Sequence, residues 1–142
     1  MAHAASAGAG SAARLLNAGE ASTPDVLAAS AFLFVCPENL GTMSGLMKEF
    51  FDRTYYAALG QIEGRAYASI IAAGSDGRGA QAQLDRIVTG WRLRRIAEPL
   101  IVNLAAQTVE AIAAPKHVPA KALKQCRHLG QAMAEGVAMG LF

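Results

Sequence analysis

The segment AFLFVCPENLGTMSGLMKEFFDRTYY, residues 31–56, decides the fold. Its first six residues are apolar and Pro37 ends the run, which is typical of a strand buried on both faces of a parallel sheet. The loop PENLGTMSG follows. An amphipathic helix is then expected over about residues 42–59, because apolar side chains recur three and four positions apart, at Met43, Leu46, Met47, Phe50, Phe51 and Tyr55.

The same alternation of strand and helix continues along the chain. The runs YASIIAA, residues 67–73, and LIVNL, residues 100–104, are predicted to be further buried strands. Amphipathic helices are expected from Ala80 to Trp91 and over about residues 119–139, the latter with an inner face formed by Leu123, Cys126, Leu129, Met133 and Val137. Because parallel strands need helical crossovers, the pattern predicts one α/β domain over residues 1–142, a three-layer sandwich with a parallel sheet.

The first thirty residues are expected to be mainly helical. Residues 3–15 predict a helix weakened by two glycines, and residues 14–18 are weakly strand-like. Thr23 before Pro24 reads as an N-cap followed by proline at the first helical position, so residues 24–30 predict a short helix.

Composition excludes several classes of protein. The chain of 142 residues is 53% hydrophobic and 17% charged, which is incompatible with intrinsic disorder. Its net charge of +2 gives no sign of a nucleic-acid partner. No apolar run approaches the length of a membrane span, and without an export signal we expect a cytoplasmic location. Cys36 and Cys126 belong to no CxxC or zinc pattern and are expected to be buried structural thiols.

Ligands of open α/β sheets bind beyond the carboxyl ends of the strands. Three loops of this chain qualify, at residues 37–45, 74–79 and roughly 105–115. The first two combine glycines with small polar residues, so backbone N–H groups could approach a flat polar ligand closely.

The sequence GRGAQA, residues 77–82, matches the dinucleotide pattern G-x-G-x-x-A. Three interpretations stay open: a dinucleotide site, a tight turn that needs glycines, or a loop contacting another cofactor. Glu98 has nearly the spacing of the acidic residue that a dinucleotide site requires, but it precedes its strand. The arginines of residues 92–95 are expected at the opposite edge of the sheet, as a solvated or oligomer-facing patch.

No organised set of acid–base residues is evident. The three histidines are scattered and form no metal-ligand pattern, so no metal site is predicted. Glu38 and Asp76 are the acidic residues of the candidate loops. Three roles stay open for them: hydrogen bonding within the loops, contact with a cofactor, or, conceivably, a carboxylate pair. Any reaction is therefore expected to belong to a bound cofactor, and no catalytic residue is assigned.

The segment PENLGTMSGLMKEFFDRTYY, residues 37–56, resembles the loop and helix after the third strand of flavodoxin-like NAD(P)H-dependent FMN and quinone reductases, with their Pro-x-x-x-Gly-x-Met-Ser-Gly pattern. AAGSDGRGAQAQLDRIVTGW, residues 72–91, is similar to the next strand, flavin-side loop and helix of that family. The resemblance covers about residues 14–142.

This resemblance implies FMN along the carboxyl edge of the sheet, NAD(P)H as co-substrate, and a quinone, flavin or similar small molecule as electron acceptor. Thr42 or Ser44 would cap the helix that follows. The resemblance also implies a homo-oligomer. The implied cofactor-binding residues are Pro37, Glu38, Asn39, Leu40, Gly41, Thr42, Gly74, Ser75, Asp76 and Gly77.

The chain departs from the family at its beginning. In the strand order 2-1-3-4-5, the first strand and its phosphate-binding loop precede the first helix, whereas this sequence opens with what resembles that helix. The expected function is FMN-dependent NAD(P)H oxidoreduction. The alternatives are a non-catalytic flavodoxin-like module that acts through oligomerisation or partner binding at unpaired strand edges, and a dinucleotide-binding domain that uses residues 77–82.

Overall fold

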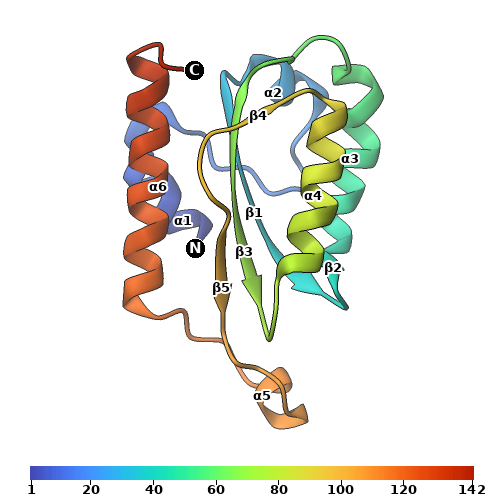
Figure 1. Cartoon of the computed structure of the whole chain (residues 1–142), viewed down its shortest axis with the longest axis vertical. Helices are drawn as coiled ribbons and strands as arrows, with labels where there is room; N and C mark the ends of the chain where they lie inside the picture. Colours follow the sequence, from blue (N-terminus) through green and yellow to red (C-terminus); the bar gives the residue numbers. More distant parts are fainter.

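A computed structural model describes all residues, 1–142, as a central sheet between two layers of helices (Figure 1). One layer contains α1 (Ala2–Ala9) and α6 (Ala120–Ala138), and the other contains α3 (Gly45–Ala58) and α4 (Arg78–Gly90). The expected three-layer α/β architecture is therefore confirmed. The shorter helices are the 3₁₀ turn Gly10–Ala12, α2 (Thr23–Ala28) and α5 (Val109–Ala113).

The sheet is built around β1 (Ala31–Asn39) and β3 (Ala66–Ala73), which pair in parallel from Ala31 opposite Ala66 to Pro37 opposite Ala72. The other edge of β3 pairs in parallel with β4 (Arg94–Arg95) and β5 (Leu100–Asn103). β2 (Thr42–Met43) pairs with the end of β1 in the antiparallel sense. The sheet is consequently mixed, and the prediction of a purely parallel sheet is wrong at this hairpin.

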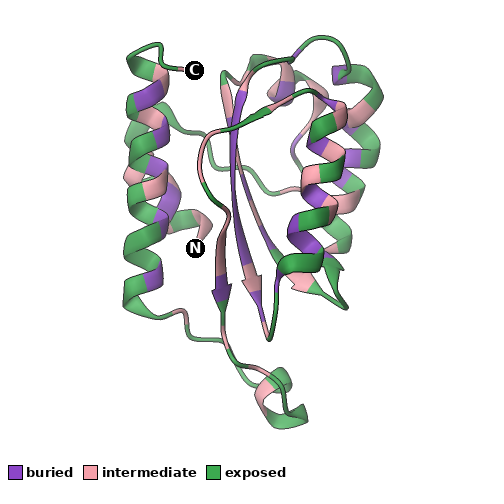
Figure 2. Cartoon of the chain, viewed as in Figure 1, coloured by how far each residue is buried: buried purple, intermediate pink, exposed green.

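The main core lies between the sheet and the layer of α3 and α4. β3 is almost wholly buried, as Figure 2 shows by its colour. Trp91 is fully buried, its ring lies 5.3 Å from that of Phe51 and 5.7 Å from that of Tyr55, and its Nε1 donates to the Tyr55 carbonyl at 2.9 Å. The aromatic helix face predicted around Phe50 and Phe51 is thus the face that packs on the sheet.

The opposite helix layer is packed through small residues. A Cβ atom added at Gly8 would overlap the Arg127 carbonyl, and one added at Gly130 would overlap the Ala5 carbonyl. α1 and α6 therefore approach each other at backbone contact, and Cys126 of α6 is fully buried. The predicted inner face of α6 is confirmed by the buried Cys126 and Met133, and Leu129 and Val137 are half-buried, whereas Leu123 still exposes 36% of its surface.

Several local expectations need correction. Pro37 does not end the first strand, which reaches Asn39. Proline has no N–H, but at the end of the sheet its carbonyl can still accept a hydrogen bond. The Pro37 carbonyl accepts one from Ser44 N at 3.1 Å. Residues 14–18 form no strand, since no neighbouring strand lies beside them to pair with. The N-cap of α2 is Ser22, one residue before the predicted Thr23.

Two further elements were missed. Residues 94–95, expected only as part of an arginine patch, pair with the first residues of β3 as β4. The loop expected at residues 105–115 contains α5, which is capped by the Thr108 side chain. No helix of the chain combines the length and apolar character needed to cross a bilayer.

Candidate functional site

The carboxyl ends of β3 and β5 point to the same end of the molecule, where the turn between β1 and β2 also lies (Figure 1). This turn has two residues, Leu40 with φ 52° and Gly41 with φ 77°. Two positive φ values are the signature of a type I′ hairpin, which matches the twist of the strands that it joins. The expected loop is therefore a tight hairpin, and it presents a fully exposed Leu40 side chain.

Glu38 joins this hairpin to the start of α4. One carboxylate oxygen accepts from the N–H of Gly77 at 2.7 Å, and the other accepts from the N–H of Ala80 at 3.2 Å. These are two of the N–H groups that a helix cannot satisfy internally, and a negative charge is favourable at that end of a helix. The cap interpretation of the Glu38 side chain is thereby confirmed.

The glycines of the G-x-G-x-x-A pattern are explained by packing. Gly77 has φ 83°, which favours glycine, and a Cβ added there would press against Ile101. A Cβ added at Gly79 would overlap the carbonyl oxygen of Gly41, so the hairpin lies directly on the first turn of α4. Because the Glu38 carboxylate already fills the N-terminus of α4, this geometry favours the tight turn over a dinucleotide site.

Ser44, not Thr42, caps α3. The Ser44 hydroxyl accepts from Met47 N at 3.4 Å, whereas the Thr42 hydroxyl donates to the Asn39 carbonyl at 3.1 Å. Met43 N donates to the Gln83 side chain at 2.9 Å, a second link between hairpin and α4. Sequence reasoning missed this glutamine, since the apolar pattern of α4 carries no sign of it.

The third candidate loop is joined to the second by hydrogen bonds and a close backbone contact. The Asn103 side-chain amide donates to the Ser75 carbonyl, and its oxygen accepts from Ala105 N at 2.8 Å. The Ala106 carbonyl lies so close to Gly74 that a Cβ there would meet it at 2.9 Å. Ser75 and Asp76 remain exposed at the surface.

The two acidic residues of the candidate loops have separate partners. Asp76 forms an exposed ion pair with Arg78 at 2.6 Å, while both oxygens of Glu38 bind the start of α4. The structure therefore gives no support to a carboxylate pair for acid–base catalysis.

Two buried groups of the sheet have a raised pKa. Burial raises the pKa of the Cys36 thiol to about 11, so it stays protonated at neutral pH. Burial and the hydrogen bond to Asp85, at 2.8 Å, raise the pKa of Tyr67 to about 12, near the amino end of β3. Both cysteines are free and buried, as expected.

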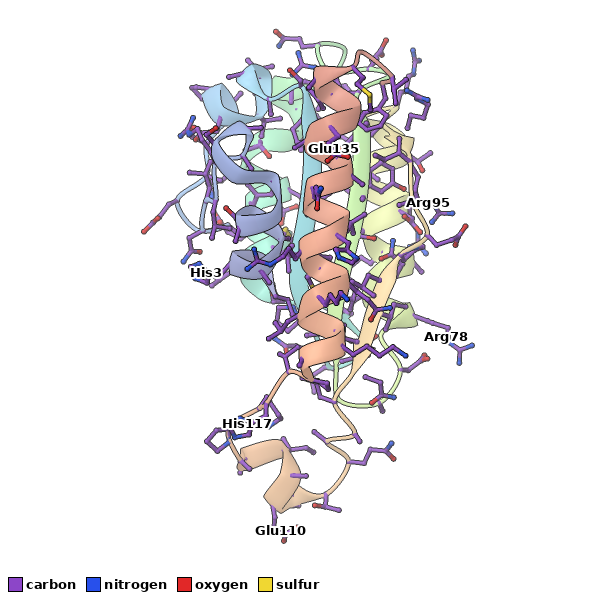
Figure 3. All side chains as sticks on the ribbon, turned by 90° about the vertical axis from the view of Figure 1, so that its left-hand side faces the viewer. His3, Arg78, Arg95, Glu110, His117 and Glu135 are labelled. Carbon is purple, nitrogen blue, oxygen red and sulfur yellow. The ribbon has the colours of Figure 1, made fainter.

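The remaining charged residues are dispersed. Figure 3 shows His3 on α1, His117 beside α5, and Arg78 and Arg95 at opposite ends of the sheet, as predicted for the arginine run. No group of three or more His, Cys, Asp and Glu residues could hold a metal ion.

The backbone at the carboxyl edge offers a set of free donors. The N–H groups of Leu40, Gly41, Ser75 and Asp76 donate to no atom of the chain. Two lie on the hairpin and two on the turn before α4, and Glu38 and Gln83 hold these two turns together. Exposed, prearranged N–H groups fit the carbonyl and nitrogen atoms of a flat, electron-accepting ring such as that of FMN. These turns leave no free helix N-terminus for its phosphate.

Comparison with known proteins decides the family. The model of the NADPH-dependent FMN reductases matches residues 12–107. The chain belongs to the NADPH-dependent FMN reductase family. No curated protein matches its sequence. The match begins before the hairpin and ends within the third candidate loop, so it includes both turns, residues 40–41 and 75–76.

Solved structures confirm the flavodoxin-like fold of this reductase-family chain. A flavodoxin from the domain Archaea superimposes with a TM-score of 0.73 at 17% identity, covering 96% of this chain and 87% of that one. A flavodoxin, WrbA-like protein from Agrobacterium tumefaciens gives 0.67 at 14% identity, with the same coverages of 96% and 87%. The flavodiiron protein from Giardia intestinalis gives 0.70 at 14% identity, over 96% of this chain and 33% of that one.

Proposed function

We propose that this member of the FMN reductase family binds FMN at the carboxyl edge and passes electrons from NAD(P)H to a small acceptor, such as a quinone or a flavin. The observation that carries the proposal is the set of four unpartnered N–H groups on two linked turns, residues 40–41 and 75–76. Family membership supports the same chemistry.

The residues of the chain would have three tasks. Backbone N–H groups of residues 40–41 and 75–76 would donate to the ring and stabilise negative charge that develops on it. The exposed Leu40 side chain would cover apolar ring surface. Glu38 would hold both turns in position without touching the ring, because both of its oxygens are engaged by α4. FMN, when bound, would supply hydride acceptance from NAD(P)H and electron transfer to the acceptor.

A titration of the purified full chain with FMN, followed by flavin fluorescence and calorimetry, tests the binding step. We expect saturable binding, and NAD(P)H oxidation in the presence of a quinone and FMN. If adding FMN gives neither a heat of binding nor a spectral change, the proposal is wrong. Homo-oligomerisation, which the resemblance implies, stays a prediction for light scattering on the same sample.

Gly41 offers a sharper test because the chain contains a matched control. Gly41 and Gly60 have φ values of 77° and 76°, and a Cβ added at either would meet no atom within 4 Å. Alanine should therefore cost each turn a similar ~1 kcal/mol. Only the methyl group at position 41 would stand on the surface where the ring is to lie. We expect Gly41→Ala to weaken FMN binding about tenfold, ~1.4 kcal/mol, and Gly60→Ala to leave it unchanged; equal affinities would contradict this placement.

A further inference from the structure

Residues 104–119, which join β5 to α6, form an arm that extends beyond the carboxyl end of the sheet, clear of both helix layers (Figures 1 and 3). Alanine, valine, isoleucine and proline make up most of the arm, and α5 lies in its middle. Val109 and Ile112 expose 78% and 62% of their surface. Because they are three positions apart, they share one face of α5, and this face is an apolar surface in water.

α5 is a formed helical turn, although it touches little of the rest of the chain (Figure 1). The Thr108 hydroxyl caps its start by accepting from Ala111 N at 3.2 Å. At its end, the Lys116 ammonium donates to the carbonyls of Ile112 and Ala114 at 2.7 and 2.5 Å. Both ends of the helix are therefore satisfied by side chains of the arm itself, and its apolar face is present before anything binds to it.

The arm starts beside the turn that carries two of the free N–H groups. The Asn103 side chain donates to the Ser75 carbonyl, and it accepts from Ala105 N at 2.8 Å. Ala105 has φ 52°, a left-handed conformation that is unfavourable for a residue with a side chain and that redirects the backbone at the foot of the arm. Because the same asparagine holds both segments, the position of the arm is tied to that of residues 75–76.

Two elements at the proposed flavin site thus carry exposed apolar side chains. Leu40 is fully exposed on the hairpin, and Val109 and Ile112 are exposed on the arm. Both elements lie at the carboxyl end of the sheet, next to the turns of residues 40–41 and 75–76 (Figure 1). Exposed leucine, valine and isoleucine side chains are unfavourable in water, and contact with an apolar ligand at this edge would remove that cost.

The charges of the arm restrict what it can contact. The Lys116 ammonium is engaged by two carbonyls at the end of α5. Hydrogen bonds from the backbone and from the Thr108 hydroxyl lower the pKa of Glu110, which therefore carries a negative charge at neutral pH. His117, the third ionisable group of the arm, lies beside α5 (Figure 3). A phosphate would thus meet a carboxylate and no free lysine, whereas an uncharged ring would meet only the apolar face.

We propose that the arm recognises the electron acceptor, and that this acceptor is an uncharged quinone that packs on Val109 and Ile112. The inference rests on the proposed function, because it assigns one substrate of that same site and favours a quinone over a phosphate-bearing flavin. Contact with the quinone would bury two side chains that are exposed in the free protein. Such a contact raises the affinity for the acceptor and involves neither FMN nor NAD(P)H, so it should act on the KM for the quinone.

The test compares the full wild-type chain, loaded with FMN, with two double variants. Val109→Gln/Ile112→Gln makes the arm face polar with a residue that favours helix. Met139→Gln/Leu141→Gln is the control, since these side chains expose 65% and 62% of their surface at the far end of α6. We expect the KM for an uncharged naphthoquinone to rise about tenfold in the arm variant alone. The kcat, the FMN affinity and the KM for ferricyanide, a charged acceptor, should stay unchanged.

Hydrogen exchange adds a readout that depends neither on turnover nor on the folding of a variant. The amides of Ala111, Ile112 and Ala114 form hydrogen bonds within the arm. Adding the naphthoquinone to the FMN-loaded wild-type chain, without NAD(P)H, should slow their exchange, because the quinone would cover the face that they support. Ferricyanide should leave their exchange unchanged.

Three results would overturn the inference: a KM for the naphthoquinone that is the same in the arm variant and the wild type, a rise in the KM for NAD(P)H instead, or unchanged exchange in the arm. Sedimentation that shows a wild-type oligomer and a monomeric arm variant would also overturn it, since a second copy would then cover the arm face. Failure of the proposed function is distinct. A wild-type chain that binds no FMN removes both proposals, whereas normal FMN binding with unchanged quinone kinetics removes only this one.

Discussion

The two faces of β1 meet very different surroundings. The side chains of Phe32, Phe34 and Cys36 alternate with those of Leu33 and Val35, as a strand requires. The first three are buried against α3 and α4, whereas the last two are half-buried on the side of α1 and α6. One face is therefore part of the aromatic core, and the other is less completely covered by the small residues of the opposite helix layer.

This difference makes the two faces unequal contributors to stability. The aromatic face joins the sheet to the helices that carry the carboxyl edge, and Glu38, next on that face, caps α4. The face toward α1 and α6 contributes less burial. Substitutions on the first face should thus lower stability more than those on the second.

The largest expected effect is that of Phe34→Ala. The Phe34 ring lies 5.7 Å from Phe32 and 5.3 Å from Phe51, and its side chain is buried. Its removal should lower the free energy of unfolding by about 3–5 kcal/mol, as for other buried phenylalanines. Val35→Ala, one residue away on the other face, should cost only about 1 kcal/mol because its side chain is half-buried. Urea unfolding measures both, and similar losses would show that the two faces are equally packed.

Much of the fold could be predicted from hydrophobic pattern alone. The runs at 31–36 and 67–73 are apolar because helices border both faces, and the spacing from Met43 to Tyr55 follows from one buried helix face. The β1–β2 hairpin was not predictable in this way. Leu40 occupies a turn position with φ 52°, where glycine or asparagine is the usual signal, so the sequence resembled a loop.

The candidate site shows a similar limit. Its location at the carboxyl edge follows from topology, and the glycines at 77 and 79 mark it in the sequence. The Glu38 contacts with α4, 39 and 42 positions further along the chain, depend on tertiary packing that no local pattern records.

Alkaline pH should reveal the burial of Cys36 on the aromatic face. Its pKa is raised by burial from an ordinary value of 9.0 to about 11. Below pH 9 the thiol is protonated in both the folded and the unfolded state, so the raised pKa contributes fully to the free energy of unfolding. As pH rises from 9 to 11 only the unfolded state loses the proton, so stability falls by up to about 2 kcal/mol over this window.

Cys36→Ala is the matching variant for this pH dependence. It should remove the part of the stability loss that lies between pH 9 and 11, although its own small cavity lowers stability at every pH. Chemical unfolding of both proteins at pH 8 and 10.5 measures the difference. If wild type and Cys36→Ala lose the same free energy between these pH values, the thiol is more accessible to water than its position on the buried face indicates.

The smallest expected effect tests whether the aromatic face and the carboxyl edge form one unit through Glu38. Glu38→Ala removes both acceptors from the N-terminus of α4, which should cost about 1–2 kcal/mol. Glu49→Ala is the control, since it breaks only the exposed pair with Arg53 on α3, and exposed ion pairs contribute little to stability. Amide exchange at Gly77 and Ala80 should accelerate in Glu38→Ala alone. If the exchange is unchanged while stability falls, Glu38 stabilises the hairpin and not α4, and the two turns are held together by Gln83 and the contact of Gly41 with Gly79 instead.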